Sequence, residues 1–405
     1  MDIEIRPCRD DAEMKGYGDV VSYVFAINDV DEIRREVKMV RPEWTMCAFD
    51  GADVVSSFAT FPFNVRLNGA VVSMGGVTGV GTMPGYRRRG LLRKTMTAGL
   101  EAMEERGQAY AILWASMGAI YQRFGYGLAA PHISYTFDPK DVELLPGPAP
   151  LGRCSLAPLD GALNTIRPIY DAYAGPRNLL IDRPEFLWNQ GPLRVRDKTR
   201  PYVAVYWNDT GEPRGYVVYT TREEDEFSLG PNQLLEVKDL AWLDLDAYRG
   251  LWEYLRSHDL VREVKLRGLV AEDDPMQGML LEPRMLNKHT IDAIWMRIVN
   301  VERGLPQRPY GDAGELRIDV VDDLLPWNSG RWLFETDGKN TKVTRTDQEP
   351  DFSMPVATLA TMVAGHRSAS FCERAGRLEA ARPEALRLAD RIFATTYAPF
   401  TPNEF

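Results

Sequence analysis

A short basic loop between an apolar strand and an amphipathic helix constrains this chain most. The sequence predicts a buried strand at Val77–Thr82, a loop at Arg87–Gly90 and an amphipathic helix at Leu91–Arg106. The first amides of a helix lack intrahelical acceptors, and the helix dipole favours negative charge there. Three arginines beside that positive end repel one another unless an anion joins them, so the stretch predicts an anion site. A surface cluster of arginines without a ligand is the alternative.

The loop differs from the two commonest phosphate-binding motifs. A P-loop ends in Gly-Lys-Ser/Thr, and a dinucleotide-binding turn carries three spaced glycines, whereas this loop has neither. After the helix, Ala111–Ala115 predicts another buried strand and Ile120–Gly127 a short helix that ends at glycine. A strand, an arginine–glycine loop, a helix and a second strand therefore form the central unit of the chain.

The segment before the basic loop predicts a helical region followed by a meander of strands. Residues 11–39 have helical periodicity, which Gly16 and Gly18 are expected to break. Two hairpins follow, with turns at Asp50-Gly51 and Asn68-Gly69, because such pairs suit tight turns between antiparallel strands. The second hairpin leads directly into the strand before the basic loop.

The central unit recurs once, with its loop altered. Residues Val237–Leu251 align without a gap on Val77–Leu91, and another helix and strand follow them. Asp244 and Asp246 lie in the second copy's loop, where two carboxylates oppose a diphosphate far more than the single Arg249 favours it. We therefore interpret the second copy as a degenerate unit that binds no cofactor. Chance similarity between two strand–helix crossovers is the alternative.

The C-terminal third follows another pattern. Four predicted strands precede three predicted helices, which is typical of an α+β layer, at 294–299, 316–320, 330–336 and 341–345 and at 355–364, 368–380 and 383–393. A proline-rich connection at 144–150 marks the other division of the chain. We expect three domains, at residues 1–145, 146–288 and 289–405.

Composition limits the partners of the protein. A length of 405 residues allows about two or three domains, and the net charge of −10 argues against nonspecific binding to nucleic acid. No apolar run is long enough to span a membrane, and the N-terminus lacks the regions of a signal peptide, so we expect a cytoplasmic protein. The four cysteines and four histidines show no ligand spacing, so we expect free thiols and no metal.

Three runs resemble those of the Eis ("enhanced intracellular survival") family of actinobacterial acetyltransferases: Val77–Val80, Arg87–Arg93 and Gly118–Gly127. The order of elements is similar over the whole chain. The resemblance implies a mixed α+β fold with two tandem GNAT domains, the second degenerate, and a C-terminal domain like sterol carrier protein. It implies an N-acetyltransferase that uses acetyl-CoA as cosubstrate. The family forms hexamers, so we expect a homo-oligomer and, by analogy, a hexamer.

The resemblance assigns cofactor contacts to three segments. The backbone of Val80, Gly81 and Thr82 would bind the pantetheine arm and the acetyl group, because pantetheine amides can add to an open strand edge. The pyrophosphate would be wrapped by six consecutive residues, Arg88, Arg89, Gly90, Leu91, Leu92 and Arg93. Ser116 and Met117 would contact the cofactor after the next strand, although the family commonly has an acidic residue where Met117 stands.

The resemblance also implies an acid and a base. Tyr121 would be the general acid that protonates the departing thiolate, whereas we expect its rival, Tyr126, to pack at a helix end. In the family, the terminal carboxylate enters the N-terminal active site and accepts the amine's proton, and here that carboxylate belongs to Phe405. A terminal carboxylate has an ordinary pKa of about 3.5, so this role requires burial or a strong donor. A frayed terminus is the alternative.

The expected reaction is direct attack by a primary amine in a ternary complex. By resemblance the acceptors are aminoglycoside-like polyamines or protein lysines, which an open acidic cleft would attract. The alternative function is a noncatalytic lipid- or ligand-binding scaffold that uses the C-terminal domain.

Overall fold

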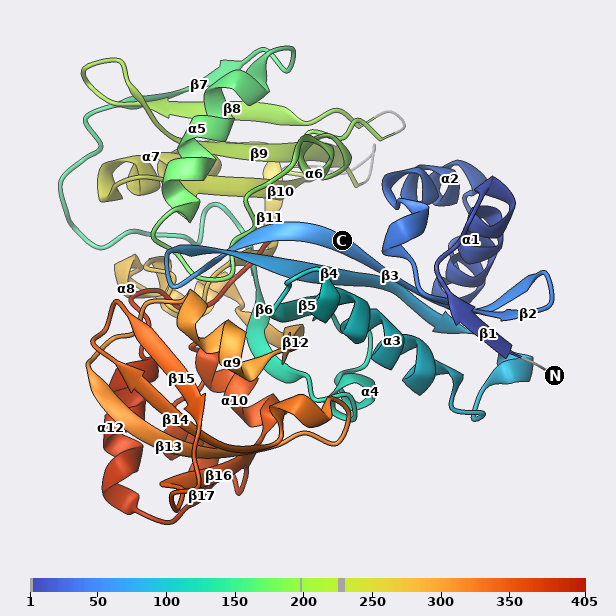
Figure 1. Ribbon diagram of the computed structural model, residues 1–405. Coiled ribbons are helices and arrows are strands. Elements are labelled where there is room, and N and C mark those ends of the chain that lie inside the picture. Colours follow the sequence, from blue (N-terminus) through green and yellow to red (C-terminus); the bar gives the residue numbers. More distant parts are fainter. Residues whose placement is uncertain (1–2, 197–198, 225–229) are drawn as a thin grey trace.

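The N-terminal part of the structure alternates helices with long antiparallel strands. This computed structural model describes residues 3–196, 199–224 and 230–405 (Figure 1). The elements of the first part are β1 (Ile3–Arg6), α1 (Asp11–Phe25), α2 (Val30–Met39), β2 (Cys47–Asp50), β3 (Asp53–Leu67), β4 (Ala70–Thr82), α3 (Leu91–Glu105), β5 (Tyr110–Trp114), α4 (Gly118–Gln122) and β6 (Gly127–Phe137). The basic loop lies between β4 and α3, as the sequence predicts.

The second part repeats the strand–helix–strand unit. Its elements are β7 (Arg153–Ala157), α5 (Ala162–Ala174), α6 (Glu185–Gln190), β8 (Tyr202–Trp207), β9 (Pro213–Glu223), β10 (Gln233–Trp242), α7 (Leu245–Arg256), β11 (Val261–Val270), α8 (Met276–Met279) and β12 (His289–Ile298). The strands β10 and β11 are parallel and connected through α7, just as β4 and β5 are parallel and connected through α3. The gapless alignment of the two copies therefore corresponds to one repeated topology.

The third part forms a separate small sheet with helices. Its elements are α9 (Val301–Gly304), β13 (Gly314–Val321), β14 (Gly330–Thr336), β15 (Thr341–Arg345), β16 (Phe352–Pro355), α10 (Val356–Val363), α11 (Ala369–Arg374), β17 (Glu379–Ala380) and α12 (Pro383–Phe393). The sheet has the order β15-β14-β13-β16-β17. The remaining described strands form one sheet, β1-β2-β3-β4-β5-β12-β6-β11-β10-β9-β8-β7.

The strand β12 inserts between two strands of the first part instead of opening the C-terminal layer. The sequence placed a strand at 294–299 in that layer, but β12 is antiparallel to both β5 and β6 and lies between them in the large sheet. This assignment was wrong because strand pairing over so long a sequence separation leaves no local signal. The domain limits at 145/146 and 288/289 stay a prediction.

One local prediction, the break of the first helix at its two glycines, is wrong for reasons of packing. Helix α1 continues through Gly16 and Gly18, because a Cβ at either glycine would approach within 2.8 Å or less of a valine side chain of β3 or α2. Both predicted hairpins are confirmed, because β2 pairs with β3 and β3 with β4 in antiparallel fashion; β3 and β4 are longer than predicted and run on through Pro62 and Gly75, which face each other. The glycines of β4 admit neighbouring side chains rather than ending the strand.

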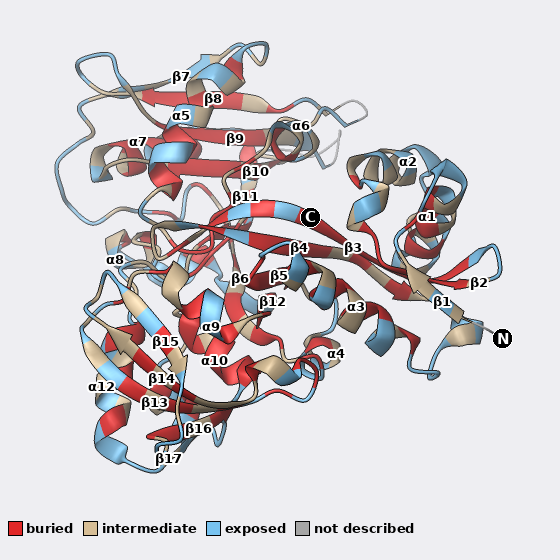
Figure 2. Ribbon diagram, in the orientation of Figure 1, coloured by how far each residue is buried: buried red, intermediate tan, exposed pale blue. Residues whose placement is uncertain are grey.

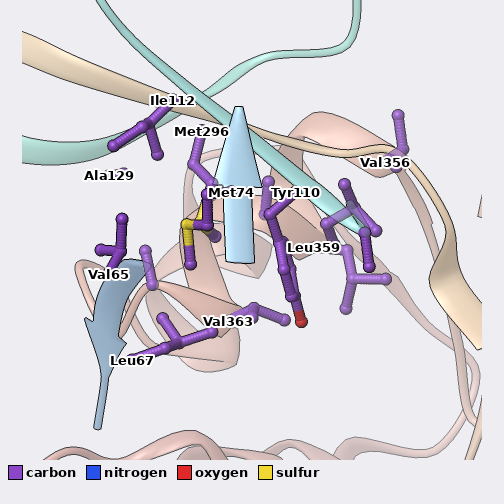
Figure 3. Packing of buried hydrophobic residues seen from close by; sticks show 14 of the residues in the cluster. Val65, Leu67, Met74, Tyr110, Ile112, Ala129, Met296, Val356, Leu359 and Val363 are labelled. Carbon is purple, nitrogen blue, oxygen red and sulfur yellow. The ribbon is translucent and has the colours of Figure 1, made fainter. Parts of the chain in front are cut away.

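A single core connects the first and third parts. In Figure 3, buried side chains of β3, β4 and β5 meet those of α10, among them Val65, Tyr110 and Leu359. Figure 2 shows that the central strands of the large sheet are buried, whereas α2 presents exposed or half-buried residues. None of the described helices is long and apolar enough to cross a lipid bilayer.

Candidate active site

A bulge in β4 lies where the resemblance to the Eis family implies the acetyl group. The pairing of β3 with β4 shifts just after Ser57, which leaves Gly79 and Val80 in the bulge. Gly79 has a φ of +58°, a conformation that glycine adopts without a steric penalty. Buried hydroxyls fix the bulge: Ser57 Oγ donates to the Gly79 carbonyl at 2.7 Å, and Ser56 Oγ donates to the Gly81 carbonyl at 2.7 Å.

The strands β4 and β5 separate beside this bulge. Their parallel pairing extends to Val77 and Leu113 and then ends. From Thr78 onward, therefore, no described strand pairs with this side of β4, and its peptide groups can bind an extended ligand that carries amides. Val80 and Thr82 are half-buried at this opening, and Gly81 is buried.

We expect Gly79→Ala to damage both the fold and the site. A Cβ at Gly79 would lie 2.1 Å from Tyr17 Oη, and alanine would also be strained at this positive φ. The free energy of unfolding should fall by about 1–3 kcal/mol and acetyl transfer should slow. Urea unfolding and steady-state rates measure both. The matched control is Gly85→Ala, because a Cβ there meets no atom within 4 Å; equal losses in both variants would contradict the prediction.

Helix α3 begins without a side-chain cap. Its N-cap is Gly90, with a φ of +75°, and its first turn contains no acidic residue. Arg88 also has a left-handed φ of +62°, which is uncommon for a residue with a side chain. Arg88, Arg89 and Gly90 are exposed. Uncapped amides, the positive end of the helix dipole and exposed guanidinium groups together fit a diphosphate.

The arginines of the loop differ in how the protein holds them. Arg87 Nε donates to the Thr82 carbonyl at 3.0 Å, and the Arg89 guanidinium lies 5.3 Å from the centroid of the Tyr86 ring. Within the described residues, the Arg88 side chain makes no hydrogen bond or ion pair. Arg88 is therefore the loop cation that is most available to a ligand.

The first turn of α3 anchors the loop in the protein. Leu91 is buried, and Leu92 packs partly buried against a second apolar cluster, so each offers only its main chain to a ligand. Arg93 Nη2 donates to the carbonyl of Asp323 at 3.1 Å, which ties the loop to the third part of the chain.

The corresponding helix in the second copy is already capped. Asp244 accepts a hydrogen bond from the Ala247 amide at 2.8 Å at the start of α7. Asp246, in the first turn, accepts a hydrogen bond from Tyr206 Oη. The Asp244 carboxylate thus caps the helix end that would otherwise bind an anion, and Asp246 adds a second negative charge in the first turn.

A cavity of about 1090 Å³ lies between the two copies and reaches the bulge of β4. Its wall comes from α1, α2, the ends of β4 and β5, α6, strands β9–β11 and residues 402–405. Four of the predicted site residues line it: Val80, Ser116, Tyr121 and Phe405. The other predicted residues lie outside it, namely Gly81, Thr82, Met117 and the loop residues Arg88, Arg89, Gly90, Leu91, Leu92 and Arg93.

Tyr121 and Tyr126 have different environments. Tyr121 is 5% exposed and borders the cavity, and its ring centroid lies 5.9 Å from that of Tyr126. Burial raises the pKa of the Tyr121 phenol, and a hydrogen bond with the Ser116 side chain opposes this in part. Tyr126 is fully buried, with its hydroxyl on the sulfur of Met96, and does not border the cavity.

The C-terminal residues are packed into the first part. The ring of Phe405 contacts that of Phe63 edge to face at 5.1 Å between centroids. Trp114 Nε1 donates to the main-chain carbonyl of Asn403 at 2.6 Å. Gly75 and Gly76 face opposite sides of β4: a Cβ on Gly75 would meet Met103 of α3, whereas one on Gly76 would meet the rings of Phe63 and Phe405. The terminus therefore lies on the face of the sheet opposite α3.

The cavity wall carries both signs of charge, so the expected acidic cleft is wrong. Among the described lining residues, the acidic ones are Glu32, Glu36, Glu236 and Glu404, and the basic ones are Arg35, Arg183, Arg194, Arg196, Arg222, Lys238 and Arg267. Most of the basic residues come from the second copy. The net charge of the chain did not reveal this distribution because it averages over both walls.

Family models match three consecutive segments of the chain. Two models described as "Acetyltransferase (GNAT) domain" match residues 4–129 and 179–301, and one described as "Sterol carrier protein domain" matches residues 301–402. These matches confirm the predicted fold class, with two GNAT domains followed by a sterol-carrier-protein-like domain. We call the parts of the molecule that contain them the first, second and third domains.

Relatives cover nearly the whole chain. An uncharacterized N-acetyltransferase from Streptomyces griseus is 31% identical over 89% of both chains. N-acetyltransferase Eis from Mycobacterium tuberculosis is 27% identical over 88% of this chain and 87% of its own. The crystal structure of Eis1 from Mycobacterium abscessus has a TM-score of 0.84 at 28% identity, covering 99% of this chain and 100% of its own. The chain belongs to the Eis-like family of GNAT N-acetyltransferases.

Proposed function

We propose that this acetyltransferase transfers the acetyl group of acetyl-CoA directly to a primary amine within the cavity. The observation that carries the proposal is that one cavity is lined by Val80 of the bulge, by Tyr121 and by the terminal Phe405. An activated acyl donor at the bulge would then lie between a candidate acid and a candidate base. No acyl-enzyme is needed, because both substrates can be held together.

The cofactor would lie along the first domain, where acetyl-CoA supplies the activated acyl group. Arg88 and the main chain of residues 89–93 would hold the diphosphate at the uncapped start of α3, and the open edge of β4 would hold pantetheine. Ser116 lines the cavity together with Tyr121 and would contact the cofactor there. Met117 is 61% exposed and lies outside the cavity, so we assign it a main-chain contact only.

The chain's own groups would carry the proton transfers. A main-chain N–H at the bulge would polarise the thioester carbonyl, and the Phe405 carboxylate would accept the proton of the attacking amine. Tyr121 would donate its proton to the departing thiolate. Burial raises the pKa of this phenol, which keeps it protonated and able to act as an acid at neutral pH.

The acceptor is a primary amine of a small molecule, such as an aminoglycoside-like polyamine, or of a lysine side chain. The mixed charge of the wall also suits amines that carry an anionic group, because carboxylates and guanidinium groups face the same space. In the cell, we propose, the protein is a cytoplasmic homo-oligomer, and a hexamer is the family's form.

A panel of amines tests this function. Purified protein with a free C-terminus is incubated with acetyl-CoA and an aminoglycoside, a lysine peptide or an amino acid, and thiol release and acetylated product are measured. We expect thiol release that requires the amine, with one acetyl group added per thiol. If acetyl-CoA binds but no amine yields product, the transferase proposal fails for these classes and the scaffold alternative gains support.

A further inference from the structure

The second domain carries a buried acidic residue at the point where the first domain has its bulge glycine. In the gapless alignment Asp239 falls on Gly79. The pairing of β10 with β9 shifts between Val237 and Asp239, and β10 separates from β11 after Val237 and Leu266. The second domain therefore has the same opening between parallel strands, but its side chains differ from those of the first.

Asp239 fixes a buried arginine in this opening. Arg183 donates to both carboxylate oxygens of Asp239, one of them at 2.9 Å, and both side chains are 1% exposed. Tyr216 Oη also donates to Asp239, at 2.6 Å, and the Arg183 guanidinium lies 3.8 Å from the Tyr170 ring centroid. A buried charge requires such pairing, and this arrangement fixes the direction of the guanidinium group.

The third nitrogen of the Arg183 guanidinium group, Nε, holds the C-terminal tail. Arg183 Nε donates to Asn403 Oδ1 at 3.1 Å, while Trp114 of the first domain donates to the Asn403 carbonyl at 2.6 Å. Asn403 is thus held through its side chain by the second domain and through its main chain by the first. Phe405, which carries the terminal carboxylate, follows two residues later on the wall of the cavity.

The preceding residues of the tail also pack on the second domain. Phe400 is buried in a cluster that contains Ala241 of β10, and Ala271, just beyond β11, packs against the same cluster. The Ala398 amide donates to Asp273 Oδ2 at 2.9 Å. These contacts come from the two strands beyond the point where they separate. In the first domain, the corresponding opening is the one that we assign to pantetheine.

We propose that the second GNAT domain uses its cofactor-like opening as the seat of tail residues 398–403, with Arg183 and Asn403 as positioning residues for the terminal carboxylate. This inference rests on the proposed role of that carboxylate as the base. The degenerate domain thereby has a part in the reaction without binding acetyl-CoA: Asp244 and Asp246 close its anion site, and the tail fills the space between its strands.

Asn403→Ala tests the seat without disturbing the buried ion pair. It removes the acceptor for Arg183 Nε but leaves the ion pair between Arg183 and Asp239 intact. We expect kcat to fall about tenfold with an unchanged KM for acetyl-CoA, because only the base is misplaced. Carboxypeptidase should also release Phe405 faster than from the wild type. The matched control is Asn300→Ala, which removes a half-buried asparagine bonded to Glu104 away from the cavity and should leave kcat unchanged.

A second variant and a deletion keep the outcomes distinct. The double variant Arg183→Gln with Asp239→Asn removes both buried charges together and should reproduce the effects of Asn403→Ala without adding to them. Deletion of Phe405 should also lower kcat. An unchanged rate after the deletion would refute the carboxylate's role itself. A different pair of results would refute only the positioning of the tail by the second domain. In that case the deletion variant is slower, but Asn403→Ala keeps the wild-type kcat and the wild-type resistance to carboxypeptidase.

Discussion

Replacing Arg88 with glutamate is expected to weaken acetyl-CoA binding about 100-fold or more. Arg88 precedes an uncapped helix start, is exposed, and has no ion pair among the described residues, so its charge is available to the diphosphate. A charge-assisted hydrogen bond contributes about 1.5–3 kcal/mol, and the new carboxylate adds repulsion, which together amount to at least two decades in affinity. Glutamate bears the same left-handed backbone strain as arginine, so the fold should be unaffected.

Isothermal titration with acetyl-CoA measures this effect, and Arg374→Glu is the matched control. Arg374 is an exposed arginine in the last turn of α11 in the third domain, so the control makes the same change in net charge far along the chain from the loop. We expect the control to bind acetyl-CoA as the wild type does. Equal affinity in Arg88→Glu and the wild type would mean that the diphosphate does not bind at α3, and the proposed site would have to be abandoned.

The local features of the fold could be predicted from sequence. Arg87–Gly90 joins a buried strand to a helix because apolar periodicity and glycine placement are properties of neighbouring residues. The repeat at Val237–Leu251 could also be recognised, because it is a pattern of neighbouring residues. The partners of β12 were not predictable, because they lie more than one hundred residues away in the chain. The helix break predicted at Gly16 and Gly18 was wrong, since the reason for glycine at these positions is the close packing of side chains from other elements.

The candidate site was predictable only in part. The resemblance to the family indicated Val80, Ser116, Tyr121 and Phe405, and these residues line one cavity. The spacing of residues in the sequence could not predict that Phe405 lies near residues some three hundred positions earlier, because tertiary packing determines this proximity. The hold on the tail by Arg183 was missed as well. Its one sequence signal was Asp239, an acidic residue that falls on Gly79 in the alignment of the two copies.

The charges of the cavity show a further limit of composition. A net charge of −10 suggested attraction of polycations, yet the described wall from the second domain is rich in arginine and lysine. Net charge describes the long-range field of the molecule, whereas an acceptor in the cavity meets individual groups at short range. The choice of acceptor therefore depends on which strand faces are turned inward, and β9–β11 turn basic residues toward the cavity.

Tyr121→Phe is expected to lower kcat about 100-fold while the affinity for acetyl-CoA stays nearly unchanged. General acids contribute about 100-fold or more, and the substitution removes only the hydroxyl from a ring that remains packed. Removal of one hydroxyl should cost about 1 kcal/mol of stability at most, so the variant should fold. Single-turnover rates and titration with acetyl-CoA separate the loss of chemistry from any loss of binding.

The pH dependence and a matched variant distinguish an acid from a packing residue. Burial raises the pKa of Tyr121 above its ordinary value of 10, so the phenol stays protonated at neutral and mildly alkaline pH. The titration of this phenol should therefore leave the ratio of the wild-type rate to the Tyr121→Phe rate constant below pH 10. The ratio should fall only above the raised pKa, where the wild-type phenol loses its proton. Tyr126→Phe removes a hydroxyl that is fully buried and off the cavity, and should keep the wild-type rate. If Tyr121→Phe also kept that rate, the thiolate would have to leave without a phenolic acid, and the raised pKa would be a consequence of burial alone.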